Sequence, residues 1–145
     1  MKHISRSLEE TAILAEKWVA TLVPGPRARV VALGGNLGGG KTAFVQAAAY
    51  ALGVTETVTS PTFVLEKVYK LAPSALFDHL IHIDAYRFDD AAELERLGWN
   101  EIIQNPKNLI CVEWPERVTR LIPEDALRID CTFIDETIHE YEIKS

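Results

Sequence analysis

Gly35-Asn36-Leu37-Gly38-Gly39-Gly40-Lys41-Thr42 is the stretch of this sequence that decides its fold. The residues before it, Arg29 to Leu33, form a continuous apolar run with β-branched side chains, typical of a strand buried on both faces. After it, Lys41 to about Leu52 is predicted to be helical, with Gly53 as a C′ cap. The stretch satisfies G-x-x-x-x-G-K-[ST] in full and lies between a strand and a helix, so it predicts a P-loop.

Each residue type of the P-loop has a physical reason to suit phosphate. Glycines let successive backbone N–H groups turn inward and remove side chains that would collide with the phosphates. The helix that starts at Lys41 directs its N-terminal N–H groups at the same anion. Lys41 supplies a cation for the β- and γ-phosphates, and the Thr42 hydroxyl is a ligand for magnesium. The motif therefore predicts a nucleoside triphosphate site, with ATP and Mg²⁺ as the expected occupants.

Two carboxylates stand where they would complete such a site. Leu80 to Asp84 and Asn108 to Glu113 are predicted strands, and each ends in an acid. Ligands of open α/β sheets bind at the carboxyl ends of strands, and a P-loop requires an acid there for the metal or its waters. In the first strand, alternation puts His82 and Asp84 on one face. The residues alone leave open which acid contacts magnesium and which orients water.

Two further positions adjoin the expected site. Thr59 to Phe63 follows the P-loop helix, where switch-like segments place a hydroxyl over the γ-phosphate, and Thr62 is the candidate. A turn made rigid by Pro61 is the alternative interpretation. Trp114, beside Glu113, either stacks on a base or packs in the core.

The remaining elements predict an α/β domain built around a central sheet, with residues 1–145 as one domain. A helix is predicted from a capping box at Ser7 to Glu10 and runs to Leu22. Further along the chain we expect a strand at Val64–Leu71, a helix at Ala91–Gln104 interrupted at Gly98, and a closing hairpin of Leu127–Ile134 and Thr137–Lys144.

Composition limits the class of protein. The net charge of −6 disfavours tight direct binding of nucleic acid by this chain. No apolar run approaches the roughly 20 residues that cross a bilayer, and Met1 to Glu10 lacks the apolar region of a secretory signal. Cys111 and Cys131 each lie inside an apolar run and are interpreted as core thiols. We expect a cytoplasmic protein that does not contact a membrane.

Several classes of P-loop protein fit the sequence less well. A GTPase carries Asn-Lys-x-Asp for guanine, which Asn105-Pro106-Lys107-Asn108 does not supply. A small-metabolite kinase usually carries an arginine-rich lid, and Arg117 with Arg120 makes a poor one. The kinase remains the main alternative, and a nucleotide-gated binding module without hydrolysis is another. A compact ATPase fits best.

The motifs together resemble the TsaE family. They are the P-loop, Ser60-Pro61-Thr62-Phe63, His82-Ile83-Asp84-Ala85-Tyr86-Arg87, Glu93-Leu94-Glu95 with Gly98, and Val112-Glu113-Trp114-Pro115-Glu116. They occur in the family's order and spacing over roughly Ser7 to Pro123. The P-loop alone is common, whereas the combination on one short chain is highly specific.

This resemblance implies a fold and a function. The fold would be a P-loop NTPase-like three-layer α/β domain, with a mixed, mainly parallel central sheet and antiparallel additions. The function would be that of the bacterial ATPase that supports threonylcarbamoyl modification of the adenosine next to the tRNA anticodon. The partner would be the TsaD–TsaB complex, with tRNA contacted only indirectly. We expect ATP hydrolysis that is slow alone and stimulated by that complex.

By matching position, the resemblance also implies residue roles. Thr42 and Glu113 would ligate the metal. The catalytic roles would fall on Lys41, Asp84 and Thr62, and nucleotide contacts on the P-loop, Trp114 and Thr11. This sequence departs from the family pattern at Gly39, Ala43 and Gln46-Ala47, where alanine, threonine and Arg-Gly are common. The missing threonine at position 43 is expected to affect the turnover rate more than nucleotide binding.

Overall fold

The computed structural model describes residues 1–36, 40–56, 58 and 65–144. Over these residues one sheet runs through the molecule, in the order β1-β7-β6-β2-β5-β4-β3. Its strands are β1 (Lys2–Ser5), β2 (Arg29–Gly34), β3 (Glu66–Lys70), β4 (His79–Asp84), β5 (Asn108–Glu113), β6 (Leu127–Phe133) and β7 (His139–Lys144). The helices are α1 (Leu8–Val19), α2 (Lys41–Ala51), α3 (Ala91–Arg96), α4 (Trp99–Ile102) and the 3₁₀ helix η1 (Pro115–Leu121).

The centre of the sheet is parallel and its margins are antiparallel. Strand β2 pairs in parallel with β5 and β6, and β5 pairs in parallel with β4. Strand β3 is antiparallel to β4, and β7 is antiparallel to both β6 and β1. Every residue of β5 is buried, as expected for a parallel strand covered on both faces. The predicted mixed, mainly parallel sheet with antiparallel additions is therefore confirmed.

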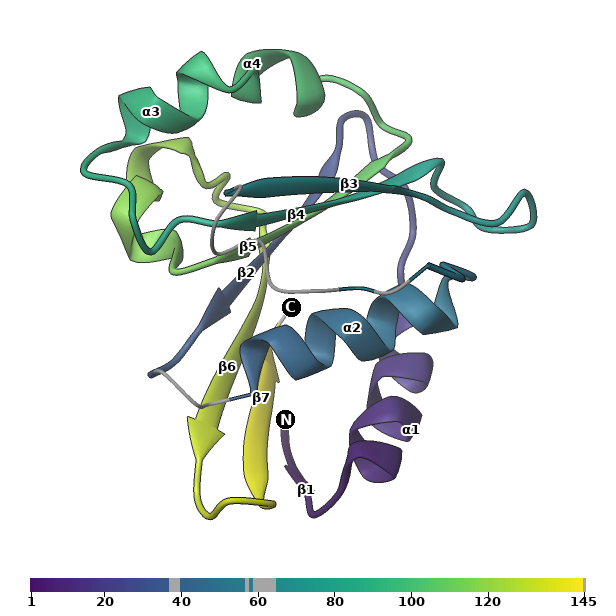
Figure 1. The fold of residues 1–145 in the computed structure, drawn as a ribbon. Helices are drawn as coiled ribbons and strands as arrows, with labels where there is room; N and C mark the ends of the chain where they lie inside the picture. Colours follow the sequence, from purple (N-terminus) through teal and green to yellow (C-terminus); the bar gives the residue numbers. More distant parts are fainter. Residues whose placement is uncertain (37–39, 57, 59–64, 145) are drawn as a thin grey trace.

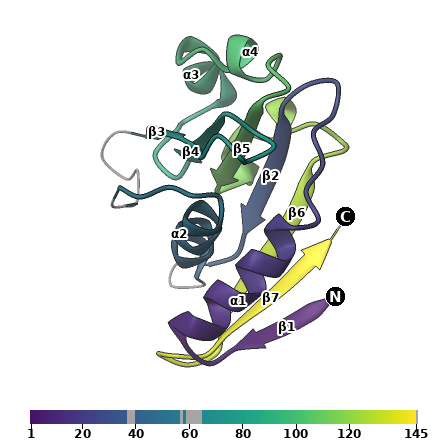
Figure 2. The same cartoon turned by 90° about the vertical axis from the view of Figure 1, so that its right-hand side faces the viewer.

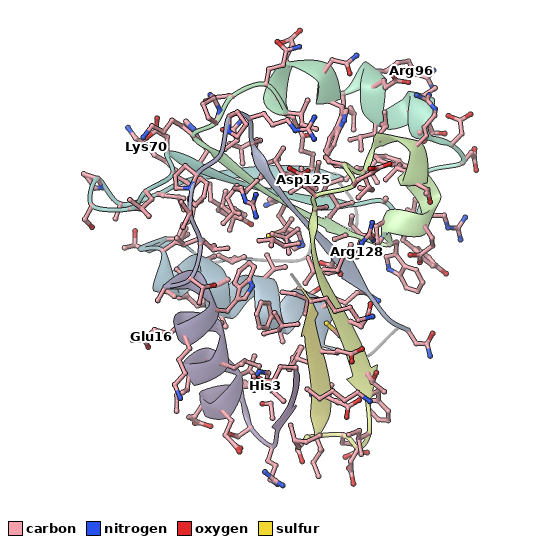
Figure 3. All side chains as sticks on the ribbon, turned by 180° about the vertical axis from the view of Figure 1, so that it is seen from behind. His3, Glu16, Lys70, Arg96, Asp125 and Arg128 are labelled. Carbon is pink, nitrogen blue, oxygen red and sulfur yellow. The ribbon has the colours of Figure 1, made fainter. Side chains whose placement is uncertain are left out.

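Helices cover both faces of the sheet, which gives three layers. Figure 1 shows α3 and α4 above β3, β4 and β5, with α2 on the opposite side, and Figure 2 shows α1 lying across β7 beside α2. From behind, in Figure 3, the labelled Arg96 of α3 and Glu16 of α1 mark these two helical layers. Phe44 of α2 belongs to the core under α1 and α2, and Trp99 of α4 to the core on the other face.

Helix α1 begins as the capping box predicts but ends earlier. The Ser7 hydroxyl accepts the N–H of Glu10 at 3.1 Å, while the Glu10 carboxylate accepts the N–H of Arg6 rather than that of Ser7. The helix ends at Val19, three residues before the predicted end. The Thr21 N–H and hydroxyl both donate to the Trp18 carbonyl, at 2.9 and 2.6 Å, and tighten the last turn. Helix α1 thus ends in a turn that still buries Leu22.

The interruption predicted at Gly98 is confirmed. Helix α3 starts at the N-cap Asp90, whose side chain accepts the N–H of Ala92 at 2.8 Å, and ends at Arg96. Gly98 has a φ of 95° and begins α4. A left-handed residue reverses the helical path, so the segment forms two short helices instead of one.

Two elements were not predicted from the sequence. Strand β1 pairs with β7 in the register Ile4↔Glu140, and the 3₁₀ helix η1 follows β5. Strand β1 has little local signal, because its backbone is satisfied by a strand at the far end of the chain. Met1 and Ile143 exchange backbone hydrogen bonds of 2.9 and 3.0 Å, so the two ends of the described chain lie together (Figure 1).

The closing hairpin has the predicted strands in slightly shorter form, with Phe133 opposite His139. The strand predicted at Val64–Leu71 spans Glu66–Lys70, and position 64 lies outside the described residues. None of the helices in the described ranges combines the length and the apolar character needed to cross a bilayer.

Candidate functional site

The site lies at the edge of the sheet where three parallel strands end. Strand β2 leads into the glycine-rich loop, and β4 and β5 end in Asp84 and Glu113. In the registers of these strands, Glu113 is opposite Leu33 on one side and Asp84 on the other. Parallel pairing therefore brings both predicted acids to the same edge of the sheet as the P-loop, the edge where ligands of such sheets bind.

Two glycines of the loop are required by its geometry. Gly35 has a φ of 122°, and a Cβ placed there would lie 2.0 Å from the carbonyl oxygen of Cys131 in β6. Gly40 has a φ of 97°, and its added Cβ would lie 2.5 Å from the Tyr141 hydroxyl. Both contacts are closer than real Cβ atoms approach, so only glycine fits either position. Leu37, Gly38 and Gly39 lie outside the described residues.

Lys41 contacts the first two residues of the P-loop. Its Nζ donates to the carbonyl oxygens of Gly35 at 2.6 Å and Asn36 at 3.1 Å, and lies 4.0 Å from the centre of the Trp114 ring. Burial lowers the pKa of Lys41, while Glu113 and other nearby acids act in the opposite direction. The ammonium is thus held by two carbonyl oxygens and a ring face, and a phosphate would bind it more strongly than these neutral groups do.

Glu113 is the acid that contacts the P-loop helix. The Thr42 hydroxyl lies 3.2 Å from Oε1 and 3.1 Å from Oε2 of Glu113. Nε2 of His82 lies 2.5 Å from Oε2 of the same carboxylate. Glu113 is only 3% exposed, yet it is hydrogen-bonded from two sides. A hydroxyl and a carboxylate from different elements therefore converge at the end of the P-loop.

Asp84 lies on the neighbouring strand with a different partner. Its Oδ1 accepts the N–H of Tyr86 at 3.0 Å, a hydrogen bond within the turn that follows β4. The residue is 7% exposed, and its N–H donates to the carbonyl of Leu65. Register with Glu113 places it one strand further from the P-loop strand β2 than Glu113.

Trp114 has an unusual backbone that turns its ring over the lysine. Its φ of 58° is left-handed, and it is the N-cap of η1, ahead of Pro115. The Trp114 ring lies 5.0 Å from the Tyr86 ring, and the Arg117 guanidinium lies 5.6 Å from that second ring. Left-handed backbone is costly for a bulky side chain, which marks Trp114 as a constrained position.

Thr11 is placed behind the loop. It is 3% exposed, and its hydroxyl lies 2.6 Å from that of Ser5. Burial raises the pKa of the Tyr141 hydroxyl, and the Thr11 side chain partly opposes that rise. The same hydroxyl donates to the carbonyl of Gly40 at 3.1 Å. Thr11 is thus a neighbour of the residue that contacts Gly40. Thr62, the predicted switch residue, lies outside the described residues.

His82 and Tyr141 also contact the site, and neither contact was predicted from the sequence. Alternation placed His82 on the face of Asp84, but gave no reason to connect it with Glu113 on another strand. Tyr141 had no signal at all, because its contact with Gly40 is made across 101 positions of the chain. Both contributions depend on which strands are neighbours in the sheet.

Comparison with known proteins identifies the family. The family described as threonylcarbamoyl adenosine biosynthesis protein TsaE matches residues 5–141. The chain belongs to the TsaE family. The resemblance stated from the motifs is thereby confirmed, and the family takes part in tRNA threonylcarbamoyladenosine biosynthesis.

Relatives within the TsaE family cover most of the chain. The TsaE of Bacillus subtilis is 36% identical over 121 residues, covering 83% of this chain and 70% of its own length. The TsaE of Rickettsia bellii is 33% identical over 134 residues, covering 92% of this chain and 87% of its own length. The crystal structure of Bacillus subtilis YdiB superposes with a TM-score of 0.77 at 27% identity, over 99% of this chain and 83% of that one.

Proposed function

We propose that this TsaE-family chain binds ATP with Mg²⁺ and hydrolyses it in the service of the TsaD–TsaB complex. The observation that carries the proposal is the contact of the Thr42 hydroxyl with both oxygens of Glu113, beside a lysine buried at the loop. A P-loop threonine next to a strand-end carboxylate is the arrangement that phosphoryl-transfer sites use for a metal–triphosphate pair.

The residues present fit magnesium. Hydroxyl and carboxylate oxygens are its preferred protein ligands, and Thr42 and Glu113 would hold it. The described residues contain no group of three or more His, Cys, Asp or Glu able to hold a metal. Magnesium typically takes one or two protein ligands and completes its shell with water and phosphate oxygens. When bound, magnesium would neutralise part of the charge on the β- and γ-phosphates.

The remaining roles, binding the phosphates and orienting the attacking water, would fall to the chain's own groups. Lys41 would exchange the carbonyls of Gly35 and Asn36 for phosphate oxygens and offset the charge of the transferred group. The amides at the start of α2 would bind the same phosphates. Asp84 would orient the attacking water and accept its proton, and Thr62 would close over the γ-phosphate. Trp114, which now covers Lys41, would lie beside the nucleotide.

The partner is proposed on the basis of family and charge. Family membership places the chain in tRNA threonylcarbamoyladenosine biosynthesis, where the TsaD–TsaB complex would transfer the modifying group. A net charge of −6 suits a protein that contacts tRNA only indirectly, through that complex. We expect turnover to be slow alone and faster on the complex, in the cytoplasm.

Phosphate release from ATP, with and without purified TsaD–TsaB complex, tests this function. Lys41→Ala and Glu113→Gln are expected to lose stimulated release by at least about a hundredfold. Asp84→Asn keeps the Oδ1 that accepts the Tyr86 N–H and is expected to retain ATP binding while losing release by about 10²-fold or more. Glu16→Gln removes one carboxylate charge, as Glu113→Gln does, but on the exposed surface of α1, and is expected to behave as wild type.

The outcome also separates the rival functions. ATP binding without release on the complex would contradict hydrolysis and favour a nucleotide-gated binding module. Transfer of labelled phosphate to an added metabolite would favour a small-metabolite kinase. Equal release with and without the complex would contradict stimulation by the partner.

A further inference from the structure

His82 is a fully buried polar residue that the proposed mechanism does not use. It lies on β4, with 0% of its surface exposed, on the same face of the strand as Asp84. Its register partner on β5 is Cys111, so its ring extends along the sheet by two residues to meet Glu113. Packing alone does not explain a polar ring here, because a buried polar group is costly unless it is hydrogen-bonded.

The direction of the His82–Glu113 hydrogen bond follows from the inventory of protons. A carboxylate that ligates a metal is ionised and only accepts, so in the proposed site Nε2 of His82 carries the hydrogen and donates to Oε2, which lies 2.5 Å away. The other ring nitrogen, Nδ1, is buried without a hydrogen-bond partner among the described residues. The ring is therefore oriented by its single bond to Glu113.

The Glu113 carboxylate is consequently fixed on two sides. The Thr42 hydroxyl reaches it from the start of α2, and His82 holds Oε2 from the adjacent strand. Thr42 contacts both oxygens, whereas His82 contacts only one of them. Without His82 the carboxylate would rotate about its terminal bond, because the Thr42 contact by itself does not distinguish Oε1 from Oε2.

We propose that His82 is a positioning residue that holds Oε2 of Glu113 and thereby presents Oε1, together with the Thr42 hydroxyl, to the magnesium ion. The inference rests on the proposed function, since it assigns a role toward the same ion. Groups that orient metal ligands from behind typically change metal affinity by 10- to 100-fold when they are removed. His82 is thus expected to govern how much magnesium strengthens nucleotide binding, and not nucleotide binding itself.

Two amide substitutions separate positioning from packing. The side-chain nitrogen of glutamine reaches about as far as Nε2 of histidine, whereas that of asparagine reaches only as far as Nδ1. His82→Gln therefore keeps a donor for Glu113, and His82→Asn, also polar, removes it. His79→Asn, at the other end of the same strand, is the matched control for the loss of an imidazole.

The measurement is the affinity for a nonhydrolysable ATP analogue by calorimetry, with excess EDTA and with excess Mg²⁺. Wild type, His82→Gln and His79→Asn are expected to share one magnesium enhancement within about threefold. His82→Asn is expected to lose tenfold or more of it, with magnesium-free affinity unchanged. An undiminished enhancement in His82→Asn, an equal loss in His82→Gln, or a parallel loss of magnesium-free affinity would each overturn the proposal.

A second readout needs no folded variant at position 82. In wild-type protein with ¹⁵N-labelled histidine, the His82 ring N–H is expected to shift when Mg²⁺ joins the bound analogue. An unmoved resonance would overturn the proposal. A wild type that binds the analogue no better with Mg²⁺ would instead overturn the metal part of the proposed function, and this inference with it.

Discussion

The hydroxyl of Tyr141 donates a hydrogen bond of 3.1 Å to the carbonyl oxygen of Gly40, joining β7, the last strand in the sequence, to the N-cap of α2. Tyr141 is fully buried, and its ring packs 5.3 Å from that of Phe44, one turn into the same helix. The antiparallel addition to the sheet thus supports the P-loop directly. A margin of the fold that carries no motif helps to hold the site.

Tyr141→Phe is expected to lower the free energy of unfolding by about 1 kcal/mol. The loss is modest because the Gly40 carbonyl still accepts the N–H of Phe44 at 3.0 Å. Urea denaturation measures the loss of unfolding free energy. Tyr50→Phe is the matched control, because the Tyr50 side chain is half exposed and its hydroxyl accepts the Val58 N–H at the long distance of 3.5 Å. Equal effects of the two substitutions would contradict a specific anchor at Gly40.

Gly35→Ala is expected to destabilise the fold strongly, by at least about 3 kcal/mol, because a new Cβ would lie 2.0 Å from backbone of Cys131 at a left-handed φ. Gly98→Ala is the control, with a similar φ of 95° and no atom within 4 Å of the added Cβ. Gly98→Ala should cost only the free energy of placing an L-residue in left-handed backbone, about 1–2 kcal/mol. Denaturant unfolding of both variants gives the difference, and similar losses would show that the close approach to β6 is unimportant.

Stability is expected to fall as pH rises above about 9. Burial raises the pKa of Cys111 and that of Cys131 from 9.0 to about 12. Between these values the unfolded chain has released protons that the folded chain retains, so rising pH favours unfolding. Each thiol contributes a slope of about −1.4 kcal/mol per pH unit in this window.

Cys111→Ala tests this pH dependence. Removing one buried thiol should make the fall of unfolding free energy between pH 9 and 11 shallower by about 1.4 kcal/mol per pH unit. The variant is also less stable at neutral pH, because it leaves a small cavity in β5. The quantity to compare is therefore the slope, measured by urea titration at several pH values. An unchanged slope would mean that Cys111 does not carry the effect.

Tryptophan fluorescence is expected to report nucleotide binding through Trp114. The Lys41 ammonium lies 4.0 Å from the centre of this ring, and phosphate oxygens should draw the ammonium away from it. Trp114→Phe should abolish the change in emission on adding the ATP analogue. Trp99→Phe should keep it, because Trp99 is only 2% exposed, inside the core against which Trp114 is only partly buried. A signal that survives Trp114→Phe would place the reporter elsewhere.

The sequence was informative wherever structure depends on neighbours along the chain. Ser7 caps α1 and Gly98 breaks the helical segment because each acts through its own backbone and side chain. The apolar runs before the P-loop and before Glu113 predicted buried strands because parallel strands are covered on both faces. These signals were sufficient to predict the fold class, and the motif combination predicted the family.

Strand pairing was not predictable in this way. Strand β1 was missed because its four residues form a strand only against β7, and η1 was missed because it depends on the left-handed turn at Trp114. The strand order also decided which acid contacts Thr42. Glu113 does so because β5 is the neighbour of β2, with Asp84 one strand further away.

The sequence by itself determined the loop, the strands that frame it and the residue types suited to phosphate and magnesium, since these depend on local backbone preferences and side-chain chemistry. Only the tertiary structure decided that His82 bonds to Glu113, that Tyr141 holds Gly40 and that Gly35 lies against Cys131. Each of these contacts joins separate strands. Their geometry follows from sheet order and register, which arise when the whole chain packs and which no local pattern encodes.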